Sequence, residues 1–143
     1  MAQCILIDHG DAVSITHPVG VTIGEIEVAL IMAQTPYSVV EKDSIPPSRV
    51  FRSAWRCLDG ALVVDMALAK EIQRDRWRAA RAPLLRALDV AWMRAEEAGD
   101  EQEKAAIAAQ KQTLRDVTET DLSGVTTPEE LEAFWPAPLT QQV

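Results

Sequence analysis

Residues 65–100 read DMALAKEIQRDRWRAARAPLLRALDVAWMRAEEAGD, and this stretch decides the fold of the chain. Apolar residues recur along it every three to four positions, which is typical of one stripe of a long amphipathic helix. The stripe consists of Met66, Ala69, Ile72 or Gln73, Trp77, Ala80, Leu84, Leu88, Ala91 or Trp92, and Ala95. Asp65 fits the N-cap position, and Gly99 is placed to end the helix. Pro83 interrupts the pattern, so we expect a kink or a short break near residues 79–83.

A second helix is predicted directly after Gly99. Residues 100–103 have the spacing of a capping box, and the apolar residues that follow repeat at helical intervals. Only a short loop separates the two helices, so they should run antiparallel. The sequence therefore predicts a helical hairpin with arms at residues 66–98 and 101–117.

A short last helix and a tail are predicted at the C-terminal end. Thr127 fits the N-cap position and Pro128 the first helical position. The acidic residues that follow Pro128 complement the positive end of the helix dipole. Pro136 ends this helix, and residues 136–143 are expected to form an extended tail.

The first 64 residues have the pattern of short strands with one helix. The predicted strands are residues 4–7, 12–16, 37–40, 51–56 and 61–64. Turn residues separate the first two strands, which should pair as a hairpin. Thr22 to Glu25 matches a capping box and begins a short helix that continues to about Met32. Asp59-Gly60 is a strong hairpin signal between the last two strands.

Amino-acid usage changes near Asp65. Residues 1–64 hold seven of the nine Ile and nine of the thirteen Val, whereas residues 65–143 hold fifteen of the twenty-one Ala and ten of the fourteen Lys and Arg. β-branched residues favour strands, and Ala and long unbranched side chains favour helices. The sequence therefore predicts an α+β protein. A small N-terminal β-rich unit with one short helix occupies residues 1–64. A C-terminal antiparallel helical hairpin and a short last helix occupy residues 65–143.

The composition excludes several classes of protein. The chain has 143 residues, of which 48% are apolar and 25% charged, which is ordinary for a globular protein. No apolar run approaches the roughly 18–20 residues that cross a bilayer, so no membrane partner is expected. The first residues lack the basic region of a secretory signal, so none is expected. Cys4 and Cys57 are too few for a disulfide scaffold and are expected to be reduced, buried thiols.

No catalytic, cofactor or metal site is predicted. The two histidines, His9 and His17, have no second His at ligand spacing and are interpreted as solvated loop residues. The sequence has no nucleophile-elbow pattern and no Gly-rich phosphate loop. We therefore expect a protein that is not an enzyme.

A basic stretch in the first long helix gives the main alternative. Residues 70–86 carry six Lys and Arg around Trp77 and could bind the phosphate backbone of a nucleic acid. The segment 96–103 is acidic, however, and the net charge of −8 repels nucleic acid. A salt-linked helical hairpin or a protein interface is therefore the preferred interpretation of this stretch, and nucleic acid is not the expected partner.

The aromatic residues give a candidate protein interface. The chain has four Trp but only one Tyr and two Phe. Three of the tryptophans fall in a helical unit that is too thin to bury them fully, and Trp is enriched at interaction hot spots. The candidate interface residues are Trp77, Trp92, Phe134 and Trp135. For Trp77 and Trp135, core and interface stay equal alternatives.

Several motifs resemble those of phage proteins. They are SRVFRSAW at 48–55, VVDM at 63–66, AKEI at 69–72, RAARAPLL at 78–85, LD at 88–89, KQTLRDV at 111–117 and WP at 135–136. Together, over residues 37–136, the pattern is similar to small proteins of tailed bacteriophages. It is loosely similar to the C-terminal part of phage tail-fibre assembly and tail assembly chaperone proteins. In place of the aromatic-rich stretch that usually follows the Leu-Asp pair, this chain has residues 90–93, VAWM.

The resemblance implies a non-enzymatic bacteriophage tail protein. It would be a virion component attached to the tail or tail fibre, or a helper of fibre assembly. Its partners would be phage tail or tail-fibre proteins, in a homo-oligomer or a hetero-complex. It would be located in the virion, or in the host cytoplasm during assembly. The alternative is a nucleic-acid-binding or regulatory phage protein that acts through residues 70–86.

Overall fold

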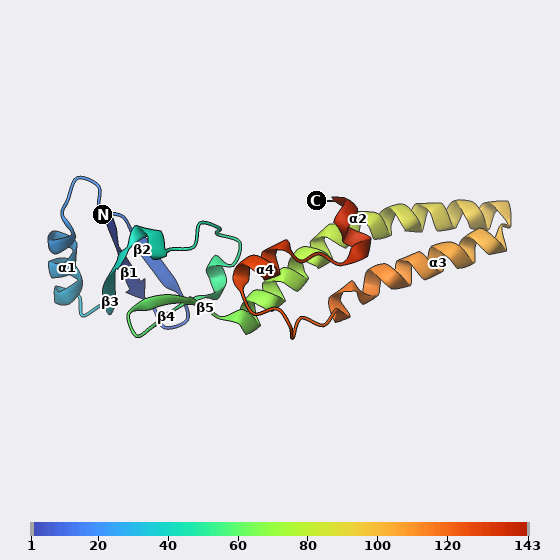
Figure 1. The fold of residues 1–143 in the computed structure, drawn as a ribbon. Coiled ribbons are helices and arrows are strands. Elements are labelled where there is room, and N and C mark those ends of the chain that lie inside the picture. Colours follow the sequence, from blue (N-terminus) through green and yellow to red (C-terminus); the bar gives the residue numbers. More distant parts are fainter. Residues whose placement is uncertain (1, 143) are drawn as a thin grey trace. The chain divides into compact units, whose positions relative to one another are not determined.

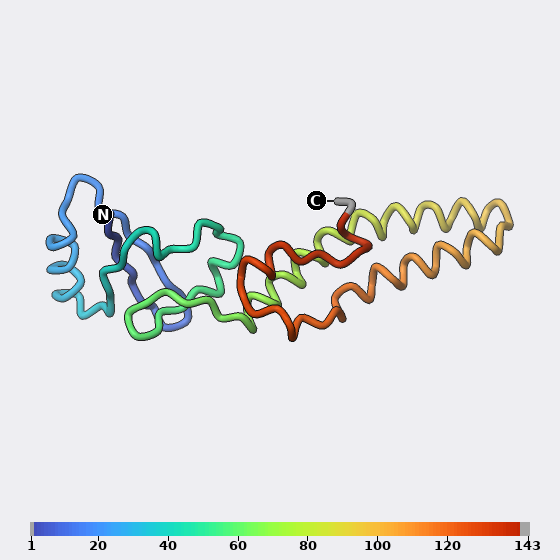
Figure 2. Tube along the Cα trace, in the orientation of Figure 1, coloured from blue at the N-terminus to red at the C-terminus, as the bar shows by residue number. Residues whose placement is uncertain are grey.

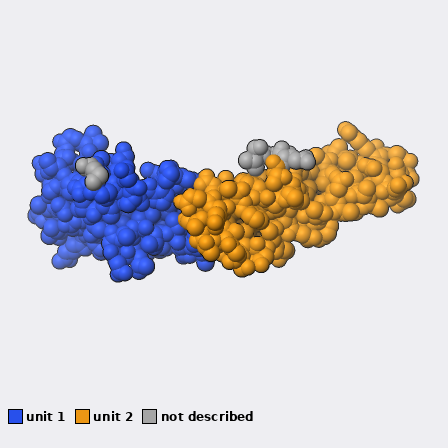
Figure 3. Space-filling view, in the orientation of Figure 1, with its two compact units in different colours: residues 1–69 blue, residues 70–143 orange. Residues whose placement is uncertain are grey.

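The computed structural model describes residues 2–142, which form two compact units (Figures 1 and 3). Unit 1 is Met1–Ala69 and unit 2 is Lys70–Val143. The boundary at 69/70 lies a few residues after the change in composition at 64/65. Strands occur in unit 1 and long helices in unit 2, which confirms the predicted α+β class.

A three-stranded antiparallel sheet forms the centre of unit 1. Its strands, in the order β2-β1-β3, are β1 (Gln3–Asp8), β2 (Val13–Thr16) and β3 (Tyr37–Glu41). The predicted first hairpin is confirmed, with Leu6 opposite Ile15. Apolar side chains fill β1, and Leu6 joins Val13 and Trp55 in a buried cluster. Cys4 is buried and Cys57 half-buried, both as free thiols.

Helix α1 (Ile23–Met32) begins at the predicted capping box. The Glu25 main-chain N–H donates to the Thr22 hydroxyl at 3.3 Å, and the Thr22 N–H donates to the Glu25 carboxylate at 2.7 Å. These bonds satisfy main-chain donors that the first helical turn leaves unpaired. No residue of α1 is fully buried, although Ile23, Ile26 and Leu30 are half-buried on one side.

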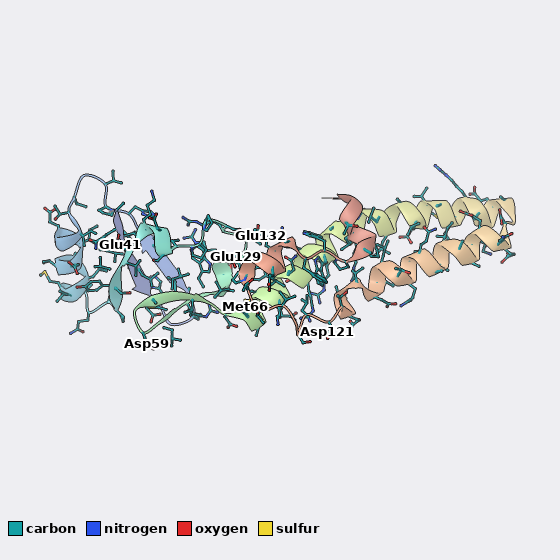
Figure 4. The ribbon with its side chains drawn as sticks, viewed as in Figure 1. Glu41, Asp59, Met66, Asp121, Glu129 and Glu132 are labelled. Carbon is teal, nitrogen blue, oxygen red and sulfur yellow. The ribbon has the colours of Figure 1, made fainter. Side chains whose placement is uncertain are left out.

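A second hairpin, of β4 (Trp55–Leu58) and β5 (Ala61–Val64), completes unit 1. Asp59 is labelled at the tip of this hairpin in Figure 4. At the turn, Asp59 has φ +51° and Gly60 has φ +78°. These are the positive values that a two-residue type I′ turn requires, as the Asp-Gly signal predicted. The predicted strand at 51–56 was too long, because Arg52–Ala54 forms a 3₁₀ turn that buries Ala54.

Helix α2 (Met66–Ala98) is continuous, so of the two alternatives predicted near residues 79–83, a kink or a short break, the break was wrong. Pro83 removes one main-chain hydrogen bond to the carbonyl of Ala79. Both residues are on the exposed side of the helix, where water can hydrate that carbonyl. The bonds of the neighbouring turns and the packing of the opposite side keep the helix intact.

Helix α3 (Glu101–Asp116) returns beside α2 and confirms the predicted hairpin (Figure 2). Gly99 has φ +68°, and its N–H donates to the Glu96 carbonyl, while the Asp100 N–H donates to the Ala95 carbonyl. This Schellman arrangement ends α2, and the Asp100 carboxylate then caps α3. A 3₁₀ turn, Val117–Glu119, follows α3.

The C-terminal segment folds onto the hairpin of unit 2. Thr127 caps α4 (Pro128–Ala133) as predicted. The extended tail predicted at 136–143 is corrected, because Ala137–Gln142 forms 3₁₀ helix and Leu139 is fully buried; Val143 lies outside the described residues. The tail supplies apolar side chains that the thin hairpin lacks. The core of unit 2 contains Trp77, Ala95, Ile107, Leu114, Val117, Leu122, Leu131 and Leu139.

Candidate protein-interaction site

The main-chain oxygen of Phe134 anchors the segment after α4 to α2. It accepts hydrogen bonds from Gln73 Nε2 at 2.9 Å and from Trp77 Nε1 at 3.3 Å. Gln73 and Trp77 are both 0% exposed. A buried amide and a buried indole both need a polar partner, and one carbonyl oxygen has two lone pairs to serve them. These two hydrogen bonds from buried side chains of α2 therefore fix the position of the Phe134–Trp135 segment.

Trp77 is a core residue, so its assignment to the interface is corrected. Its ring packs against the Phe134 ring with centroids 6.0 Å apart and planes tilted by 46°. A side chain with no exposed surface cannot contact a partner of the folded chain. The hairpin is deep enough to bury it because the C-terminal segment covers α2 here.

Trp135 is half-buried and held from one face by a cation. The guanidinium of Arg76 lies 5.2 Å from the ring centroid, within the range of a cation–π contact. Arg76 also donates to Gln73 Oε1 at 2.7 Å. The indole thus stays partly open to solvent in one defined orientation, which is the state that favours a binding hot spot.

Phe134 and Trp135 line a surface hollow of about 470 Å³. Its other walls come from the end of α3 and the proline-rich segment, including Val117, Thr120, Pro136 and Pro138. A second hollow of about 370 Å³ lies between α2, α3 and Pro138, and it shares Thr113 and Pro138 with the first. Thr113, Asp116 and Thr120 add polar groups to the first hollow, whose aromatic and proline walls suit a mainly apolar peptide segment. Phe134 remains 36% exposed at this surface.

Trp92 lies apart from both hollows and contacts α3. Lys104 Nζ is 5.3 Å from its ring centroid. Lys104 also forms ion pairs with Glu96 on α2 and Glu101 on α3. Hydrogen bonds to Glu96 first, and then to Glu101, raise the pKa of the Lys104 ammonium. Trp92 is half-buried, and its environment is that of a hairpin contact.

Comparison with known proteins finds no relative of this chain. No family model, curated protein or solved structure matches the chain. Among residues 2–142, no three His, Cys, Asp or Glu side chains are grouped as a metal site would need. His9 and His17 are both exposed, and His9 Nε2 lies 2.9 Å from the Ser14 hydroxyl. No helix in the described part of the chain has the length and apolar character to span a bilayer.

Four of the six cationic side chains in the basic stretch have partners inside unit 2. Arg74 pairs with Glu71 and Arg78 with Asp75. Arg76 contacts Gln73 and Trp135. Arg81 donates to the main-chain oxygens of residues 114 and 115 at 3.2 and 2.6 Å. These contacts do not support the nucleic-acid alternative, since the side chains serve the hairpin itself.

Three residues of the site were not predicted from the sequence. Gln73 and Arg76 fix Phe134 and Trp135, and Pro138 connects the two hollows. Gln73 had a visible signal, because it is polar yet lies on the apolar stripe four residues before Trp77. A polar residue on such a stripe needs a hydrogen-bond partner. Nothing in the local sequence identifies that partner as the carbonyl of Phe134.

Proposed function

We propose that this chain is a non-enzymatic bacteriophage tail protein that binds another tail or tail-fibre protein through the Phe134–Trp135 surface. The observation that carries the proposal is the position of Trp135, which is held by Arg76 yet open to the hollow of about 470 Å³. The phage context comes from the motifs over residues 37–136. A preordered aromatic side chain loses little entropy on binding, which strengthens a contact.

The bound segment would be an extended apolar peptide of the partner. The hollow is lined by aromatic and proline side chains and by the polar side chains of Thr113, Asp116 and Thr120. Such walls offer wide apolar contact with a few hydrogen-bonding groups to set direction. Truncation of a well-packed interface Trp commonly costs about 2–4 kcal/mol, or roughly 30-fold to 1000-fold in affinity.

The test is made in the phage that encodes the chain. Virions are purified from the wild type, from a deletion, and from Trp135→Ala. The copies of this chain and of each tail protein per particle are counted by mass spectrometry. Gln102→Ala is the matched control, because Gln102 is exposed on α3 and lies away from the hollow.

A virion component would be present in wild-type particles and depleted in Trp135→Ala but not in Gln102→Ala. An assembly helper would be absent from particles, and both the deletion and Trp135→Ala would produce virions that lack fibres. Particles of normal composition from the deletion would overturn the proposal. Salt-sensitive gel retardation of DNA by the purified chain would instead favour the basic stretch as the functional surface.

A further inference from the structure

The first of two exposed apolar surfaces lies on α1. We call it the α1 outer face: Glu25, Val28, Ile31 and Met32, on the side of the helix opposite the residues that pack on β1. Val28 is 57%, Ile31 62% and Met32 82% exposed. Five of the nine exposed large apolar side chains of the described chain fall between residues 19 and 32. Apolar surface concentrated in this way marks an interaction site.

The charges of α1 are all negative. Its charged residues are Glu25, on the outer face, and Glu27. The main-chain N–H and the hydroxyl of Thr22 donate to the Glu25 carboxylate and hold its pKa below the ordinary value. Glu25 is therefore anionic at neutral pH, beside the apolar side chains. A partner of this face needs apolar groups next to a cation.

The second surface, on α2, has that chemistry. We call it the α2 stripe: Arg86, Val90, Met93 and Arg94, which share one side of the helix at spacings of three, four and eight. Val90 is 43% and Met93 54% exposed. Within residues 2–142, neither Arg86 nor Arg94 has a salt-bridge partner. Two acidic residues adjoin the stripe: Asp89, which pairs with Lys111 on α3, and the exposed Glu97, three positions after Arg94.

We propose that the α1 outer face of one copy of the chain binds the α2 stripe of a second copy. Val28, Ile31 and Met32 would pack between Val90 and Met93, and Glu25 would face Arg86 or Arg94. The exposed apolar side chains of each helix would be covered by those of the other. The contact removes apolar surface from water and pairs charges at its rim.

Other occupants of the α1 outer face fit less well. Pairing α1 with a second α1 would bring acidic side chains together with no cation on either helix. An anionic membrane surface would repel Glu25 and Glu27. A second copy of the chain supplies both the apolar groups and the cations. Because the two surfaces differ, two copies can exchange both contacts in a symmetric pair, or successive copies can form a ring or a filament.

The size of the contact sets the concentration at which it forms. Helix α1 has ten residues, a length of about 15 Å, so one contact buries less than the roughly 800 Å² per partner of a stable interface. Association should therefore be weak and visible at high micromolar concentration. Neither surface shares a residue with the Phe134–Trp135 hollow, so this inference does not rest on the proposed function.

The test is complementation between two variants of the purified full chain, followed by sedimentation equilibrium. Ile31→Gln with Met32→Gln removes the α1 outer face, and Val90→Gln with Met93→Gln removes the α2 stripe. Gln preserves helix propensity and adds no charge. All four positions are exposed, and far-UV circular dichroism checks the fold. Ala105→Gln with Ala109→Gln, at exposed positions of α3, is the matched control.

Wild type and control should associate, and each variant alone should sediment at 15.7 kDa. The equimolar mixture should recover a species of twice that mass, because each variant keeps the surface that the other lacks. A wild type that is monomeric up to millimolar concentration overturns the proposal. So does a mixture that stays monomeric, or association that survives the loss of the α2 stripe.

Discussion

The indole N–H of Trp77 donates to the main-chain oxygen of Phe134 at 3.3 Å, across 57 positions of sequence. The rings of the two residues also pack together, with centroids 6.0 Å apart. This pairing closes the C-terminal segment over α2 and gives unit 2 a core. Trp77 therefore determines where the Phe134–Trp135 surface lies without belonging to it.

Replacing Trp77 by Ala should lower the free energy of unfolding by about 3–5 kcal/mol, the usual cost of removing a fully buried large aromatic side chain. Urea denaturation followed by circular dichroism measures the change. Trp92→Ala is the comparison, because Trp92 is only half-buried and should cost clearly less. Equal losses for the two variants would contradict the core assignment of Trp77.

The elements of this fold were predictable where local chemistry determines them. Thr22 and Glu25 define the start of α1, Asp59 and Gly60 define a hairpin turn, and Gly99 ends α2. Each signal acts within a few residues and needs no tertiary partner. The helical hairpin follows from two adjacent amphipathic helices joined by a short loop.

The rest required long-range packing that local patterns do not encode. The tail after Pro136 was predicted as extended because prolines disfavour regular helix. Burial of Leu139 against the hairpin instead orders it as 3₁₀ helix. For the same reason the sequence could not show that Trp77 is buried and Trp135 is not, since the carbonyl that pairs with Trp77 belongs to Phe134, in the segment just before that tail.

Pro83→Ala should stabilise the chain, because it restores the main-chain hydrogen bond that proline removes from the interior of α2. Proline in a helix interior costs about 3 kcal/mol relative to Ala, part of which the stiffer unfolded chain offsets. We expect a gain of about 1–3 kcal/mol, measured as a higher melting temperature. Ala87→Gly, at an exposed position one turn on, should lower stability by about 1 kcal/mol. A Pro83→Ala variant that is less stable than the wild type would contradict this prediction and would show that the native geometry of α2 depends on the proline.

Two glycines of unit 1 should respond to Ala in opposite directions. Gly24 lies inside α1, where an added Cβ would meet nothing nearer than the Thr22 hydroxyl oxygen at 4.0 Å. Gly24→Ala should stabilise by about 0.5–1 kcal/mol. Gly60 has φ +78° in the hairpin turn, so Gly60→Ala should destabilise by about 1 kcal/mol. Thermal melts of both variants under one condition give the comparison, and a shared sign would contradict the turn geometry.

The capping box of α1 should leave a signature at acid pH. The Thr22 main-chain N–H, and then its hydroxyl, hold the pKa of Glu25 below the ordinary value of 4.5. A lowered folded-state pKa means that this carboxylate stabilises the fold fully above pH 4.5, and that the contribution disappears as pH falls through the lowered value. Titration of the Glu25 carboxyl carbon by NMR measures it. Thr22→Ala removes the hydroxyl and should move the pKa part of the way up, whereas Thr22→Ser keeps the hydroxyl and should leave it low. Asp121, whose low pKa comes from hydrogen bonds with Ser123, should not move in either variant. A Glu25 that titrates at 4.5 or above in the wild type would show that the box is not closed in solution.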